Sequence, residues 1–177
     1  TVYSEATDYL CGDPIPDLYG GFGTSVSFFG FDASVQFGYS IGGLVYDSGY
    51  AALMSPPGSS TGSNIHRDIL DAWTPSNNGS AIPRFQYLDE NIAAQSDRFL
   101  TDASYLNFQS AQIGYTLPQK VTEKLRISRM RVYVLCDNIF YWSARKGLDS
   151  RYSFTGATAY AVNSPVRTLS GGISVTF

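Results

Sequence analysis

Apolar and polar residues alternate strictly from Phe31 to Ile41. One parity is apolar and the other is polar or glycine: Phe31, Ala33, Val35, Phe37, Tyr39 and Ile41 against Asp32, Ser34, Gln36, Gly38 and Ser40. Because successive side chains of a strand point to opposite faces, this period of two predicts a β-strand with one apolar and one polar face. Residues 22–28 alternate as well, and Gly30 lies where the two runs meet. Residues 22–42 are therefore predicted to form a tight hairpin.

Three further strands are predicted in the second half of the chain. Residues 102–117 and 130–142 are rich in Tyr, Ile, Val and Phe, and residues 166–177 alternate as the hairpin does. The apolar parity of this last strand, which faces lipid if the sheet spans a membrane, includes Ile173, Val175 and Phe177. The 13 Tyr, 11 Phe and 17 Gly of the chain also favour strands and turns over packed helices. The sequence thus predicts an all-β fold.

Two of these strands do not alternate cleanly. In residues 102–117 the apolar parity changes near Gln109 and Ser110, which predicts a β-bulge or a membrane boundary at that point. In residues 130–142 both parities carry apolar side chains, and only Asp137 indicates which face avoids lipid. We expect Asp137 to face the lumen of a barrel.

The lengths of the strands and of their connections indicate a transmembrane antiparallel β-barrel. The strands are about 9 to 13 residues long, and a tilted strand needs roughly 9 to 11 residues to cross a membrane. Short and long connections alternate, as in outer-membrane barrels, where turns are periplasmic and loops are extracellular. With the C-terminus in the periplasm, residues 118–129 form a periplasmic turn. The long extracellular loops are then residues 1–21, 43–101 and 143–165.

The longest of these loops is predicted to contain a short helix. Ile65, Ile69, Leu70 and Trp73 recur at helical spacing, and Pro75 follows them.

Aromatic side chains of the loops are candidate contacts for a ligand or for a protein that caps the barrel. These side chains are Trp73, Tyr87 and Tyr152. Receptor loops commonly carry recognition, although packing of the rings within the loops is the plainer interpretation.

Several classes of function are disfavoured. The net charge is −3, and Lys and Arg form no basic stripe, so nucleic-acid binding is not expected. No apolar run reaches the roughly 18 to 20 residues of a spanning helix. His66 is the only histidine, and the neighbours of Cys11 and Cys136 suggest neither a metal site nor a redox pair. No catalytic, metal-binding or cofactor-binding residue is predicted, and the chain is not expected to be an enzyme.

Five segments resemble the SusC/RagA-type TonB-dependent outer-membrane receptors of Bacteroidetes, and they occur in the order of that family. The segments are residues 12–22 (GDPIPDLYGGF), 39–43 (YSIGG), 71–75 with 82–84 (DAWTP and IPR), 96–118, and 167–177. The likeness extends over nearly the whole chain. Cys136 and Asp137 depart from the usual choices in the penultimate strand.

The resemblance implies a fold, a location and partners. Members of the family form a 22-stranded barrel with an N-terminal plug, in the outer membrane of Gram-negative bacteria. They import oligosaccharides or peptides with energy from the TonB complex, and a SusD-like surface lipoprotein usually caps them. About five strands cannot close such a barrel. Residues 1–177 are therefore expected to be the C-terminal part of its wall, in contact with outer-membrane lipid, while the missing N-terminal part contacts TonB.

The end of the chain resembles a signal for assembly. Ile173, Val175 and Phe177 match the terminal signature by which the outer-membrane barrel assembly machinery recognises strands.

Two other functions remain open from the sequence. The chain is alternatively a receptor-like structural subunit of a larger outer-membrane assembly. A soluble β-sandwich that binds a glycan is a third interpretation, and it predicts solubility without detergent.

Overall fold

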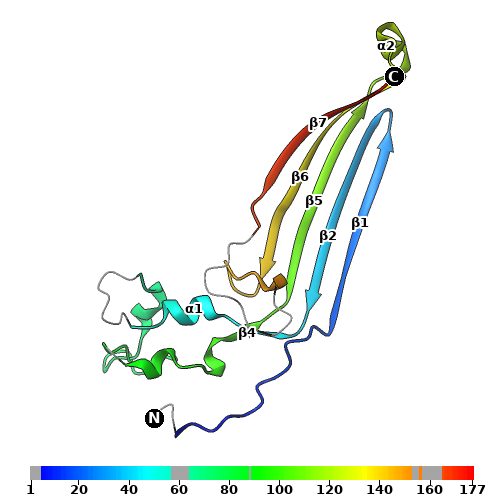
Figure 1. The fold of residues 1–177 in the computed structure, drawn as a ribbon. Helices are drawn as coiled ribbons and strands as arrows, with labels where there is room; N and C mark the ends of the chain where they lie inside the picture. The colour runs from blue at the N-terminus through cyan, green and yellow to red at the C-terminus, as the bar shows by residue number, and fades with distance from the viewer. Residues whose placement is uncertain (1–4, 57–63, 88, 153–155, 157–164) are drawn as a thin grey trace. The chain divides into compact units, whose positions relative to one another are not determined.

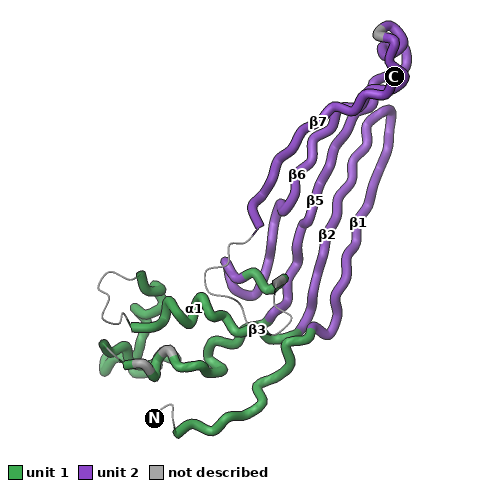
Figure 2. The backbone as a smooth tube through the Cα atoms, in the orientation of Figure 1, with its two compact units in different colours: residues 1–15, 43–102, 149–162 green, residues 16–42, 103–148, 163–177 purple. Residues whose placement is uncertain are grey.

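The computed structural model describes residues 5–56, 64–87, 89–152, 156 and 165–177. The chain divides into two compact units, which Figure 2 shows in different colours. The sheet unit consists of residues 16–42, 103–148 and 163–177. The loop unit consists of residues 1–15, 43–102 and 149–162. No helix within the described residues is long and apolar enough to cross a membrane.

The sheet unit contains one five-stranded sheet (Figure 1). Its strands lie in the order β1 (Leu18–Phe28), β2 (Phe31–Ile41), β5 (Tyr105–Thr116), β6 (Arg129–Ser143) and β7 (Thr168–Thr176). All four pairings are antiparallel. Each strand therefore lies beside the strand that follows it in this sheet, as an up-and-down wall requires. The predicted all-β fold with five long strands is confirmed.

The hairpin between β1 and β2 turns at Phe29 and Gly30. Both residues have positive φ, 48° at Phe29 and 86° at Gly30. Two successive positive φ angles define the two-residue turn whose twist matches that of the flanking strands. The predicted turn at Gly30 is thus confirmed. β1 begins at Leu18 rather than at residue 22, because Gly20 and Gly21 conceal the alternation there.

The predicted bulge lies in β5. Phe37 pairs with Phe108 and Gln36 pairs with Ser110, so Gln109 is one extra residue in β5. The register between β5 and β6 shifts at the same point. An extra residue reverses the facing of every side chain beyond it, which explains the change of parity in the sequence.

The connection from β5 to β6, residues 117–128, is an ordered turn. It contains α2 (Gln119–Thr122) and η5 (Glu123–Leu125). Thr122 is fully buried, and its backbone carbonyl accepts a hydrogen bond of 3.0 Å from the Ile127 N–H. The Ser128 N–H donates a bond of 2.8 Å to the carbonyl of Thr176. The first bond closes the turn on itself, and the second attaches it to the end of β7.

The loop unit is built from short elements around a small core. The elements are β3 (Leu44–Tyr46), α1 (Ser48–Leu53), η2 (Arg67–Asp71), η3 (Glu90–Ala93), η4 (Asp97–Phe99), β4 (Leu100–Asp102) and η6 (Ser150–Tyr152). β3 pairs with β4. The side chains of Ala51, Met54, Ile69 and Phe99 are buried together as the core. β4 includes Asp102, so the predicted strand of residues 102–117 begins only at Tyr105.

The helix predicted among residues 64–73 is present as the 3₁₀-helix η2. Its predicted apolar face is only partly correct, because Ile69 is 7% exposed and Leu70 is 87% exposed. A 3₁₀-helix has three residues per turn instead of 3.6, so residues spaced for an α-helix do not share a face. The α1 helix was not predicted. It begins after Asp47, whose carboxylate accepts a hydrogen bond of 2.9 Å from the Tyr50 N–H.

Candidate functional site: the two faces of the sheet

The strand registers bring the apolar parity of all five strands to one face of the sheet. Opposed residues of an antiparallel pair point to the same side. One row of this apolar face contains Phe28, Phe31, Tyr115, Val132 and Ile173. Phe31 and Tyr115 are in ring contact, with centroids 4.5 Å apart. Ile173 and Val175 of β7 therefore lie on one continuous surface with the apolar residues of β2.

The bulge at Gln109 keeps this surface continuous. Leu106 and Phe108 have one parity, and Ile113 and Tyr115 have the other. With Gln109 as an extra residue, both pairs reach the apolar face, where Phe108 pairs with Phe37 and Ile113 pairs with Ala33. A regular strand would instead turn one pair to the polar face.

Aromatic rings cross the apolar face near the middle of the strands. Phe37 stacks on Phe22 at 5.0 Å and on Phe108 at 4.4 Å, with interplanar angles of 13° and 15°. Phe140 pairs with Phe108 across β5 and β6, and it makes an edge contact with the Trp142 ring at 6.3 Å. The rings therefore form a band across four strands.

No layer of described residues covers the apolar face. Ile113, Phe140 and Ile173 are 60%, 55% and 63% exposed. In water, burying apolar surface of this kind releases about 25 cal/mol per Å², so a soluble chain would cover it. A bare face of this extent indicates contact with lipid or with another apolar surface.

The height of the apolar face matches a membrane. From Phe31 to Ile41 the strand advances ten residues, or roughly 33 Å at about 3.3 Å per residue. With the usual tilt of about 40° this becomes roughly 25 Å along the membrane normal, which is the height of the apolar band of outer-membrane barrels.

The opposite face of the sheet is polar. Among its residues are Ser25, Asp32, Ser34, Gln36, Asn107, Gln112 and Ser174, with the tyrosines Tyr19, Tyr133 and Tyr141. Asp137 pairs with Ser110, which pairs with Gln36. The structure thus places Asp137 on the polar face, the face that we expected to avoid lipid.

An ion pair crosses the polar face over a glycine. The Arg131 Nε donates to Asp32 at 2.9 Å, and the guanidinium also contacts the second carboxylate oxygen. Asp32 lies on β2 and Arg131 on β6, so the side chain of Arg131 passes over β5 at Gly114. A Cβ at Gly114 would lie 2.5 to 2.8 Å from the guanidinium atoms. The Arg131 guanidinium also lies 5.0 Å from the ring centre of Tyr133.

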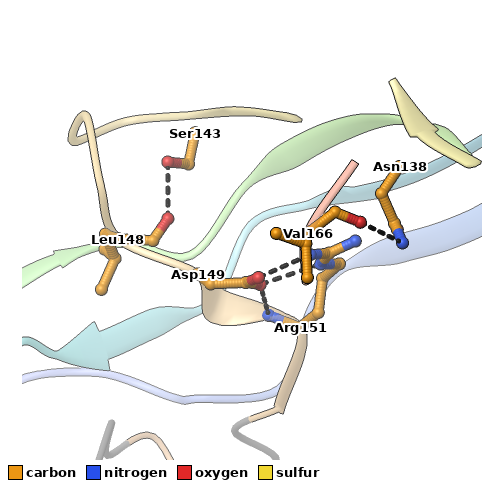
Figure 3. A network of polar contacts seen from close by, with 6 residues as sticks. All are labelled: Asn138, Ser143, Leu148, Asp149, Arg151 and Val166. Atoms are coloured by element: carbon orange, nitrogen blue, oxygen red, sulfur yellow. Dashed lines mark hydrogen bonds and ion pairs between the residues drawn. The ribbon is translucent and has the colours of Figure 1, made fainter. Parts of the chain in front are cut away.

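Polar contacts fix the conformation of the chain that follows β6 (Figure 3). In the sheet unit, the Ser143 hydroxyl donates to the Leu148 carbonyl at 2.9 Å, and the Asn138 amide donates to the Val166 carbonyl at 3.4 Å. In the loop unit, the Arg151 Nε donates to Asp149 at 2.9 Å, and both side chains are largely buried.

The outer edges of the sheet are unpaired within the described residues. β1 pairs only with β2, and β7 pairs only with β6. In a membrane, a free strand edge leaves unsatisfied N–H and C=O groups in hydrocarbon, at several kcal/mol each. A lipid-facing sheet of this kind therefore requires further strands on both sides.

The loop residues singled out from the sequence are not gathered into one site. Trp73 is 37% exposed, and its backbone N–H donates to the Ile82 carbonyl at 2.9 Å. Tyr87 is 60% exposed. Tyr152 ends η6, but its side chain lies outside the described residues. Leu70, which the helical spacing placed on the apolar face, is instead 87% exposed.

The described residues contain no group of three or more His, Cys, Asp or Glu side chains placed to hold a metal ion. Cys11 and Cys136 are free thiols.

Comparison with known proteins gives consistent results. The chain matches no protein-family profile. It is similar to TonB-dependent receptor P3 of Formosa agariphila, with 28% identity over 85% of the chain, and to TonB-dependent receptor P26 of the same organism, with 26% identity over 95%. It spans only 14% and 18% of the length of these two relatives.

Solved structures show the same fold. The RagAB peptide importer in its closed-closed state superimposes with a TM-score of 0.76 at 23% identity, over 95% of this chain and 18% of that one. The open-open state gives a TM-score of 0.72 at 24% identity, over 92% of this chain and 17% of that one. The fold is that of an outer-membrane β-barrel receptor wall, and the resemblance seen in the sequence is confirmed. The similar proteins are receptors and importers, not enzymes.

Proposed function

We propose that this chain supplies barrel wall and loops to a TonB-dependent receptor that imports an oligosaccharide or a peptide across the outer membrane. The observation that carries the proposal is the two-faced sheet. Its bare apolar face is roughly 25 Å high, and its polar face carries hydroxyl, amide and tyrosine side chains. Such a wall separates lipid from a water-filled lumen.

The proposed orientation follows from the connections. The two-residue turn at Phe29 and Gly30 and the turn of residues 117–128 are short, and the loop unit is long. Barrels of this class have short periplasmic turns and longer extracellular loops. We place the loop unit outside the cell and Phe177 in the periplasm. The remainder of the proposed receptor supplies the other strands of a 22-stranded barrel, the plug and the contact with TonB.

Three partners are proposed besides lipid and TonB. A SusD-like surface lipoprotein would cap the loop unit, where Leu70, Trp73 and Tyr87 offer exposed apolar surface. The barrel assembly machinery would read the terminal Ile173, Val175 and Phe177. The RagAB protein is named as a peptide importer, which supports a peptide as one substrate class. The resemblance to SusC/RagA-type receptors supports an oligosaccharide as the other.

The first test is the size and the behaviour of the native protein. The 19.3 kDa chain covers 18% of a relative, so the receptor is expected to be about 100 kDa, as a closed barrel with a plug requires. It should sediment with outer membranes and migrate faster in SDS gels before boiling than after. A 19.3 kDa species that is soluble without detergent contradicts the proposal.

The second test is growth on single nutrients. Deletion of the gene should abolish growth on one oligosaccharide or peptide source, and a variant unable to contact TonB should fail in the same way. Normal growth on every source, together with stable co-purification in a larger complex, would favour the structural subunit instead.

A further inference from the structure

The charge of the sheet unit is concentrated at one end. Five of the 12 basic residues of the chain lie within residues 120–131, and Glu123 is the only acidic residue of that segment. They are Lys120, Lys124, Arg126, Arg129 and Arg131. We propose that the turn of residues 117–128 binds the phosphoethanolamine headgroup of a membrane phospholipid, with Lys120 and Arg126 on the phosphate and Glu123 on the ammonium.

Two of the five cations are directed elsewhere. Arg131 is held by Asp32 on the polar face. Arg129 lies two residues before Arg131 in β6 and therefore points to the same face. Lys120, Lys124 and Arg126 are exposed on the turn itself. Within the described residues, no ion pair and no side-chain hydrogen bond engages these three side chains. They are therefore available to an external anion.

The turn forms a hollow of mixed charge. The hollow has a volume of about 400 Å³ and is lined by Gln119, Glu123, Arg126, Ile127 and Ser128. Arg126 has φ of 55°, which ends η5, and the bond from Ile127 to the buried Thr122 fixes the backbone behind it. Guanidinium groups bind phosphate by paired charge-assisted hydrogen bonds. The carboxylate of Glu123 would repel a second anion but attract an ammonium, so a zwitterionic headgroup fits both charges.

Exposed apolar side chains surround the same end of the sheet. Phe28 and Phe29 are 67% and 85% exposed, Phe177 is 89% exposed, and Val121 of α2 is 44% exposed. α2 and the C-terminus lie at one end of the strands in Figure 1. Phe31 begins the apolar band in β2, so the hairpin turn before it lies at the level of the headgroups. Aromatic rings and cations together are typical of that interface.

This inference rests on the proposed function, because it requires that the sheet spans a membrane. The test uses the full-length receptor, purified and stripped of lipid in detergent. Native mass spectrometry then measures binding of added phosphatidylethanolamine and of phosphatidylcholine, whose ammonium carries three methyl groups and no N–H. Wild type is expected to bind phosphatidylethanolamine more tightly than phosphatidylcholine.

Two variants separate the contributions to binding. Lys120→Gln/Arg126→Gln is expected to weaken binding of both lipids at least about tenfold, since it removes the charge-assisted hydrogen bonds to the phosphate. Glu123→Gln is expected to remove only the preference for phosphatidylethanolamine. The control is Arg84→Gln/Lys146→Gln, which removes the same charge at exposed positions outside the turn and should leave binding unchanged.

The outcomes are distinguishable. Equal lipid binding by wild type and Lys120→Gln/Arg126→Gln overturns the inference, and it would leave a periplasmic protein as the partner of the turn. A Glu123→Gln variant with an intact preference overturns the assignment of the ammonium. If the receptor is not heat-modifiable in SDS gels, the proposed barrel itself fails.

Discussion

Replacement of Val35 by arginine tests whether the apolar face of the sheet lies in lipid. Val35 lies four residues beyond Phe31 on β2, which is roughly 13 Å along the strand and roughly 10 Å along the membrane normal at a tilt of about 40°. The apolar band is roughly 25 Å high, so Val35 is within a few Å of its midplane. An arginine at the midplane of a barrel costs about 2 to 4 kcal/mol on the lipid face.

The matched control is Gln36→Arg, the same introduced side chain one residue further on the opposite face. Gln36 pairs with Gly23 and Ser110 on the polar face, so this variant should lose less than about 0.5 kcal/mol, as ordinary surface substitutions do. The difference, about 1.5 kcal/mol or more, corresponds to at least about tenfold in the folding equilibrium.

The measurement is urea-dependent folding of the full-length receptor into phospholipid bilayers, followed by heat-modifiable migration and by tryptophan fluorescence. A lower urea midpoint for Val35→Arg but not for Gln36→Arg is expected. Equal midpoints for the two variants, or a loss confined to Gln36→Arg, would refute the assignment of the faces.

Three further predictions follow from the register of the sheet. Deletion of Gln109 should prevent assembly, because it turns half of β5 to the wrong face; normal amounts of barrel in the outer membrane would contradict the role of the bulge. Gly114→Val should lower the urea midpoint, since overpacking typically costs about 1 to 3 kcal/mol and the new side chain displaces Arg131. Gly171→Ala, whose Cβ would lie 3.8 Å from the backbone oxygen of Tyr133, should fold like wild type in the same titration. Val175→Arg should cost only about 0 to 1 kcal/mol in that titration, because Val175 lies one residue before the end of β7; a loss as large as that of Val35→Arg would place it deep in the membrane.

The parts of the fold that could be predicted from the sequence are those with a clear local periodicity. The alternation at residues 31–41 and 168–176 identified β2 and β7, and the change of parity at Gln109 identified the bulge, because each depends only on which way successive side chains point. Glycine at positions 20 and 21 weakened the pattern, so the start of β1 was placed too late. Of the short helices of the loop unit only η2 was predicted, because a turn or two of helix carries no full apolar period.

The sequence by itself determined that the chain makes long two-faced strands joined by unequal connections, since side-chain parity and turn residues are local properties. Only the tertiary structure decided which parities join into one surface. The pairing of Ile113 with Ala33 and of Val132 with Ile173 depends on register between strands distant in sequence. The salt bridge from Arg131 to Asp32 spans 99 residues and needs the bare backbone of Gly114 between them. Such contacts arise from hydrogen bonding between strands, which no single stretch of sequence specifies.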